Sequence, residues 1–164
     1  MNFYPWIVLI HILGAFLFAL SHGVALWMVY QLPREKERSR IAALVDLSQA
    51  SIGTMYAGLL LLLIGGIWAG IAGNWFSRGW IWAAIGVLVA IVVLMYAVAA
   101  PYFRNLRIAV GAGAPYARKG QAMPEPLPDA DVIALAARSP VGILSAAGFG
   151  GLVVILWLMV VKPF

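Results

Sequence analysis

The sequence predicts an all-α membrane protein in which four transmembrane helices pack as one bundle. The chain of 164 residues is 64 % hydrophobic and only 10 % charged, whereas soluble domains are about half apolar and a quarter charged. Four stretches are apolar over the roughly 20 residues that a hydrocarbon core of about 30 Å requires. They cover residues 5–30, 50–73, 79–100 and 140–161. We therefore expect a single membrane domain over 1–164, with connecting segments at 31–49 and 101–139.

The basic residues predict the orientation of these helices. Nine of the eleven Lys and Arg residues fall in the two segments 31–49 and 101–139, namely Arg34, Lys36, Arg38, Arg40, Arg104, Arg107, Arg118, Lys119 and Arg138. Loops rich in Lys and Arg remain in the cytoplasm. Both termini are then expected on the outer side of a bacterial inner membrane. Because the positive charge reports topology and no aromatic residues are interleaved with it, we expect no nucleic-acid partner.

Prolines and local composition predict where the elements begin and end. Pro5 lies in the first turn of helix one, Pro33 and Pro101 are expected to end helices one and three, and Pro140 to begin helix four. The sequence DADVIALAARS, residues 129–139, has acidic residues at its start and apolar residues at helical spacing. It predicts a short helix on the cytoplasmic interface before helix four.

Small residues recur at a spacing of four on two of the predicted helices. They are Gly66 and Gly70 on helix two, and Gly142, Ala146 and Gly150 on helix four. Because helices associate in lipid through close packing, such rows predict contact faces. Packing within the bundle and dimerisation are both consistent with this pattern.

Two histidines, His11 and His22, occur in the first predicted helix, in the stretch HILGAFLFALSH. Eleven residues at 100° each fall within about 20° of three full turns, so the two rings share a face and stand roughly 16 Å apart. Gly14, Ala15 and Phe18 lie between them on that stripe. A polar ring in hydrocarbon usually faces protein, water or a cofactor.

Haem is the leading candidate for that cofactor, because imidazole from a bundle helix is a common axial ligand. The expected topology brings Met55 and Tyr56 of helix two, and Met95 of helix three, to the level of His22, whereas His11 has mainly Trp68 and Met159. We therefore predict a haem b site in which His22 is the better-supplied ligand and His11 forms a second site. Its candidate cofactor-binding residues are His11, His22, Met55, Tyr56 and Met95, and its candidate metal ligands are His11 and His22.

Two alternatives to haem remain open at this stage. Sets of His and Met also suit copper(I). Each histidine could instead hydrogen-bond a neighbouring helix, or pair with its copy in a symmetric dimer.

Several function classes lack the residues they need. No Asp, Glu, Lys or Arg lies well inside a predicted span, which disfavours proton pumps and ion-coupled transporters. No nucleophile–base arrangement, phosphate-binding loop or metalloprotease motif is present, and the absence of cysteine excludes a disulfide.

Three stretches together carry a family resemblance: HILGAFLFALSHGVALWMVYQLPRE, GGIWAGIAGNWFSRGWIW and LWLMVVKP. They resemble an uncharacterised bacterial family of four-helix integral membrane proteins. This family is distantly similar to the membrane domain of copper-resistance protein D and to HemJ-type protoporphyrinogen oxidase.

The resemblance implies a role for one of the two histidines. In the HemJ group, an early histidine in helix one and a Leu-Pro-Arg turn near its end are associated with haem; His11 and the turn Leu32, Pro33 and Arg34 match them. The group also carries a lysine in its third helix, and this chain has none between Trp80 and Tyr102. The copper-transport group implies metal-handling residues, of which His11 is the match. His22 belongs to neither pattern.

Three functions follow as hypotheses. The first is a b-type haem-binding membrane protein in electron transfer or haem-linked redox chemistry, with a lipid-soluble partner such as quinone. The second is a non-catalytic small subunit or assembly partner in a homodimer or larger membrane complex. The third is a copper-handling membrane protein.

Overall fold

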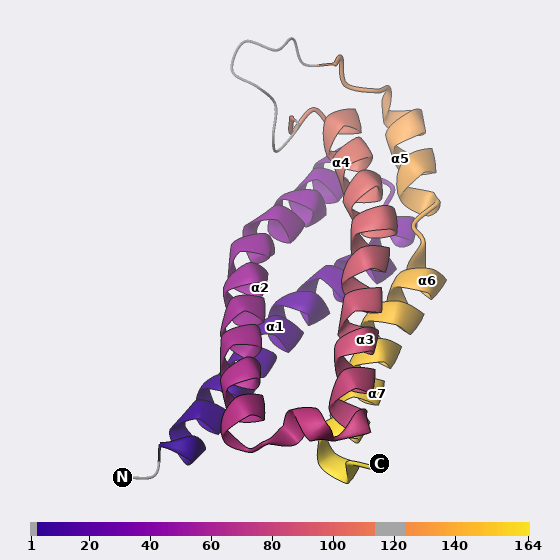
Figure 1. The fold of residues 1–164 in the computed structure, drawn as a ribbon. Helices are drawn as coiled ribbons and strands as arrows, with labels where there is room; N and C mark the ends of the chain where they lie inside the picture. Colours follow the sequence, from indigo (N-terminus) through magenta and orange to yellow (C-terminus); the bar gives the residue numbers. More distant parts are fainter. Residues whose placement is uncertain (1–2, 114–123) are drawn as a thin grey trace.

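The fold is all-helical in the computed structural model, which describes residues 3–113 and 124–164. Four helical stretches are long and apolar enough to cross a bilayer: Tyr4–Arg34, Arg38–Ala72, Gly79–Ala109 and Val141–Val161. They stand side by side as an elongated bundle (Figure 1). The predicted architecture of four transmembrane helices is confirmed.

Two of the four spans are interrupted by π-helical turns. The first span is α1 (Tyr4–Gln31) with the 3-10 turn η1 (Leu32–Arg34), and the second is α2 (Arg38–Ala72), followed by the 3-10 turn η2 (Trp75–Ser77). The third comprises α3 (Gly79–Leu94), the π-turn η3 (Met95–Ala99) and α4 (Ala100–Ala109). After α5 (Asp129–Ala137), the fourth comprises α6 (Val141–Ser145), the π-turn η4 (Ala146–Gly150) and α7 (Gly151–Val161).

The third helix does not end at Pro101, contrary to the expectation from the sequence. It continues as α4 to Ala109 because the π-turn η3 comes directly before the proline. The Ala100 N–H donates to the Met95 carbonyl, five residues back. In a regular α-helix the proline ring would clash with the carbonyl four residues back, and the widened turn displaces that carbonyl.

Close backbone contacts join α1 and α2 as an antiparallel pair. A Cβ placed on Gly65 of α2 would lie 2.7 Å from the backbone nitrogen of His11, and one on Gly14 of α1 would lie 2.8 Å from the Leu61 carbonyl carbon. Helices approach this closely only where side chains are absent. These contacts, with that of Gly58 against Phe18, place the His11 end of the histidine stripe against α2.

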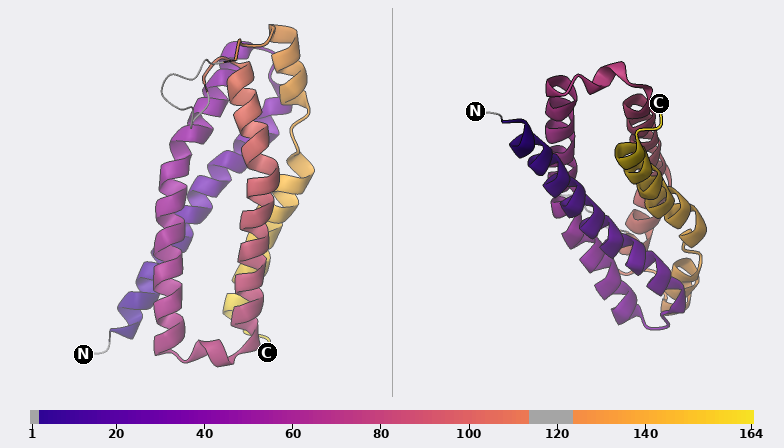
Figure 2. Two further views of the ribbon diagram at one scale, coloured as in Figure 1. Left: turned by 45° about the horizontal axis from the view of Figure 1, so that its top comes forward. Right: turned by 90° about the horizontal axis from the view of Figure 1, so that it is seen from below.

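The helices α3 and α7 form a second pair beside the first (Figure 2). Gly151 at the start of α7 lies against the Ile91 side chain of α3. The small-residue row predicted on helix four does not form this contact. A Cβ on Gly142 or Gly150 would meet no atom within 4 Å.

A buried apolar cluster closes the end of the bundle opposite the two termini (Figure 1). The predicted short helix is present there as α5, and its Val132 and Ala136 are fully buried. The cluster consists of Leu32, Ile41, Val45, Leu106, Ala109, Val110, Val132 and Ala136. This packing explains why α2 begins at Arg38, before the predicted span, because Ile41 and Val45 of its first turns belong to the cluster.

Candidate functional site

His11 lies in the contact between α1 and α2 in a fixed orientation. Its Nδ1 lies 2.8 Å from the Leu62 carbonyl oxygen of α2. A carbonyl oxygen only accepts, so Nδ1 carries the hydrogen and the neutral ring has its lone pair on Nε2. Ligating histidines are commonly oriented by such an N–H bond to a backbone carbonyl. His11 therefore has the tautomer and the anchoring of a metal ligand.

Gly66 of α2 makes room for the His11 ring, and the adjacent Gly65 lies against the His11 backbone. A Cβ on Gly66 would lie 2.9 Å from both Cε1 and Nδ1 of the ring, so any side chain there would push the imidazole away. The side chain of His11 is half-buried. Of its expected neighbours, Trp68 is 57 % exposed and Met159 packs against the cluster around Trp80 at the terminal end of the bundle.

His22 lies deeper in the bundle, with 7 % of its surface exposed. Its ring stacks on Phe18 with the centroids 5.7 Å apart and the planes 15° from parallel. Among the described residues, Nε2 is buried without a hydrogen-bond partner. Leaving a buried polar atom unpaired costs about 1–3 kcal/mol. Such a group in a native fold suggests a missing partner.

Met95 and Gly148 converge on His22 from the third and fourth spans. A Cβ on Gly148 would overlap His22 Nε2 and would lie 3.2 Å from the Met95 methyl carbon. The imidazole nitrogen and the thioether side chain therefore lie against one point of the fourth span. Of the predicted residues, the structure brings His22 and Met95 together at this point.

Both residues that meet His22 belong to π-turns. Met95 is the first residue of η3, and Gly148 lies within η4. π-turns are rare and occur frequently at functional sites, where they re-aim side chains. Gly148 could not be identified from the sequence, because it lies outside the row of small residues at a spacing of four and because no simple residue pattern marks a π-turn.

The other two residues predicted at this level, Met55 and Tyr56, belong to α2. The register that places Gly65 against His11 and Gly58 against Phe18 places Met55 opposite the turn of α1 that holds His22. Met55 is half-buried, and Tyr56 is 49 % exposed.

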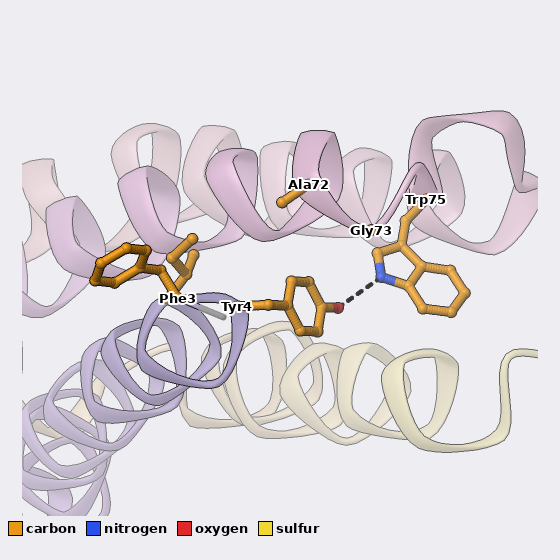
Figure 3. Close-up of a pocket in the computed structure, with 6 residues that line it drawn as sticks. Phe3, Tyr4, Ala72, Gly73 and Trp75 are labelled. Carbon is orange, nitrogen blue, oxygen red and sulfur yellow. Dashed lines mark hydrogen bonds between the residues drawn. The ribbon is translucent and has the colours of Figure 1, made fainter. Parts of the chain in front are cut away.

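A pocket of about 530 Å³ opens at the terminal end of the α1–α2 pair (Figure 3). It is lined by Phe3, Tyr4, Ile7, Ala72, Gly73 and Trp75. The Trp75 indole N–H donates to the Tyr4 hydroxyl at 2.9 Å across it. Ile7 precedes His11 by one helical turn on the same face. The volume falls in the range of roughly 300–1,000 Å³ typical of small-molecule sites, and the recess is largely open to its surroundings.

Within the described residues, no group of three or more His, Asp or Glu side chains could hold a metal ion. A metal or cofactor in this chain would have to be held by fewer protein ligands, or by histidine together with methionine.

Comparison with known protein families matches residues 5–163 to a family described as a predicted integral membrane protein, DUF2269. No curated protein matches the chain, and no solved structure matches it.

Proposed function

The chain belongs to the DUF2269 family of predicted integral membrane proteins. Because this family description states no activity, we propose the function from the geometry of the candidate site. The proposal is a b-type haem-binding membrane protein in electron transfer or haem-linked redox chemistry, with His11 as an axial ligand. It rests on the Nδ1 hydrogen bond of His11 to the Leu62 carbonyl, which leaves the lone pair on Nε2. Bound haem would supply a one-electron carrier.

His11 is favoured over His22 as the axial ligand because of the space around each nitrogen. His22 Nε2 is enclosed by Gly148 and lies next to Met95, which leaves no slot for a flat macrocycle. His11 is half-buried at the edge of the helix pair. The resemblance of His11 and the Leu32-Pro33-Arg34 turn to the HemJ pattern favours the same residue.

A lipid-soluble quinone is the proposed electron partner. The pocket at Tyr4 and Trp75 supports it, since this pocket is lined by aromatic rings with a hydroxyl and an indole N–H (Figure 3). It begins one helical turn from His11, close enough for direct electron exchange with a cofactor there. The second axial position would be open or filled by a second copy of the chain in a homodimer.

The test is a reduced-minus-oxidised visible spectrum of the protein purified in mild detergent from haem-replete cells, with iron and copper analysis of the same sample. We expect a sharp α-band with iron in the wild-type protein. The His11→Ala variant should lose most of the band, because the iron loses its anchored nitrogen. His22→Ala is the matched control, and it should keep the band.

Two results would overturn the proposal. The first is a full α-band in the His11→Ala variant that elutes as a folded species. The second is a wild-type protein that is colourless and free of iron, with a melting temperature that does not respond to added haem. That second result would favour the hypothesis of a non-catalytic subunit, in which His11 only joins α1 to α2.

A further inference from the structure

We propose that His22 and Met95 form a site for a single soft monovalent metal ion, of the class of Cu(I) and Ag(I), in the middle of the bundle. This site is separate from the haem proposal, because it uses the other histidine and a different set of helices. The first observation that points to it is the Nε2 atom of His22. It is buried without a hydrogen-bond partner among the described residues, in a side chain that is only 7 % exposed.

The second observation is the convergence of a soft ligand on the same point. The Met95 methyl carbon and His22 Nε2 both lie against the Cβ position of Gly148. The sulfur is one bond from that methyl carbon, and methionine has three rotatable bonds, so the thioether can turn toward Nε2 without moving the backbone. The site therefore offers one imidazole nitrogen and one thioether sulfur.

The chemistry of these two ligands selects the class of ion. Imidazole suits several transition metals, but thioether sulfur selects soft ions such as Cu(I). Both ligands are neutral, and within the described part of the chain no cluster of His, Asp and Glu accompanies them. A divalent ion would carry two uncompensated charges into this buried place, which is costly in a low-dielectric interior. A monovalent ion carries only one.

The two π-turns build the site. Met95 opens η3 and Gly148 lies within η4, so each of the two spans that face His22 departs from regular α-helix where it meets the ring. Phe18 stacks on the imidazole from the preceding turn of α1 and holds its plane. Nε2 of His22 is thereby shielded from the surroundings, as a site for a single small ion requires.

Silver(I) is the probe for the test, because it binds like Cu(I) and needs no reductant. Detergent-purified full-length protein is titrated with silver nitrate in chloride-free buffer, and bound silver is measured after desalting. We expect one tightly bound ion per chain in the wild-type protein. His22→Ala and Met95→Leu should each weaken that binding by at least about tenfold, as the loss of even an outer-sphere partner often does.

Met55→Leu serves as the matched control. It removes a half-buried methionine at the same level on α2 and should bind silver like the wild-type protein. The proposal is overturned if Met95→Leu binds as tightly as wild type, or if Met55→Leu loses as much affinity as Met95→Leu. A single peak in size exclusion shows that a variant is folded. If His22→Ala gives no single peak, the difference in silver affinity between Met95→Leu and Met55→Leu still tests the proposal.

X-ray absorption at the copper edge provides a second readout on Cu(I)-loaded protein. One nitrogen and one sulfur scatterer are expected in the first shell, and a shell without sulfur would contradict the role of Met95. The haem spectrum does not enter either readout. A protein that is colourless, free of iron and unresponsive to added haem, yet binds silver through His22 and Met95, would therefore refute the haem proposal while leaving this one standing.

Discussion

Individual glycines decide where the functional side chains of this protein can lie. Gly65 and Gly66 bring the backbone and ring of His11 against α2, and Gly148 brings the fourth span against His22. At each position a Cβ would meet the histidine at less than a van der Waals separation. In a membrane, where water gives no drive for helices to associate, this close fit is the main attraction between them.

Replacing Gly65 with alanine tests this close fit. A Cβ there would lie 2.7 Å from the His11 backbone nitrogen, and overpacking of this kind costs about 1–3 kcal/mol. We expect Gly65→Ala to lower the free energy of unfolding in detergent by that amount.

The control is Gly53→Ala on the same helix, where a Cβ would meet no atom within 4 Å. It should be neutral or stabilise the protein by up to about 1 kcal/mol, because alanine favours helix more than glycine does. Equal stability of the two variants, measured by thermal unfolding in one detergent, would show that the glycine contacts do not hold α1 on α2.

At the scale of elements, hydrogen bonds from Arg38 at the start of α2 connect α5 to the rest of the bundle. The Arg38 guanidinium donates to the Leu127 carbonyl at 2.7 Å, to the Asp129 carboxylate at 3.0 Å and to the Ala109 carbonyl at 3.2 Å. The Leu127 N–H also donates to the Ala109 carbonyl at 3.0 Å. One side chain thus joins the start of α2, the end of α4 and the chain entering α5.

Removing this arginine should loosen α5. We expect Arg38→Ala to lower the free energy of unfolding by about 1–2 kcal/mol, because three hydrogen bonds to a partly exposed charged group are lost. Amide hydrogen exchange in α5 should accelerate at the same time.

Arg40→Ala is the matched control, since Arg40 pairs with Glu35 at 3.0 Å and its side chain is 66 % exposed. Exposed pairs of this kind contribute little, so the loss should be no more than about 0.5 kcal/mol. If α5 exchanges no faster in Arg38→Ala than in Arg40→Ala, the buried Val132 and Ala136 hold the helix without the arginine.

Across the whole molecule, the basic residues are distributed unevenly along the long axis of the bundle. The basic residues predicted to face the cytoplasm lie at the end that holds α5 wherever the structure describes them; Arg118 and Lys119 lie outside the described residues. Both termini lie at the opposite end (Figure 1). Because the two ends of the bundle lie on opposite sides of the membrane, the predicted orientation, with both termini outside, can be tested by chemical labelling.

The chain contains no cysteine, so single cysteines can report the orientation directly. Ser77 in η2 lies at the terminal end of the bundle and Ser39 in the first turn of α2 lies at the α5 end, and both are exposed. In spheroplasts, a membrane-impermeant maleimide should label Ser77→Cys and should label Ser39→Cys only after lysis. The reverse pattern would place the basic loops outside.

The parts of this fold that could be predicted from the sequence depend on local properties, namely the length of apolar segments, the composition at helix ends and the regular spacing of residues along a helix. Apolar length predicts the four spans, because a bilayer requires a fixed number of apolar residues. Acidic residues before an apolar periodic segment predict α5. A spacing of eleven places His11 and His22 on one face of α1, because helical geometry is regular.

The contacts that each histidine side chain makes were decided only by the tertiary structure. They depend on which helices pack together and on where a π-turn interrupts a helix. His11 finds the Leu62 carbonyl since two glycines let α1 lie on the backbone of α2. His22 finds Met95 and Gly148 at two π-turns. Met95 was already expected at the level of His22, because it precedes the widened part of its helix. A π-turn shifts every later side chain by about 100° relative to a regular α-helix, so periodicity extrapolated from the sequence cannot foresee that Gly148 faces the ring.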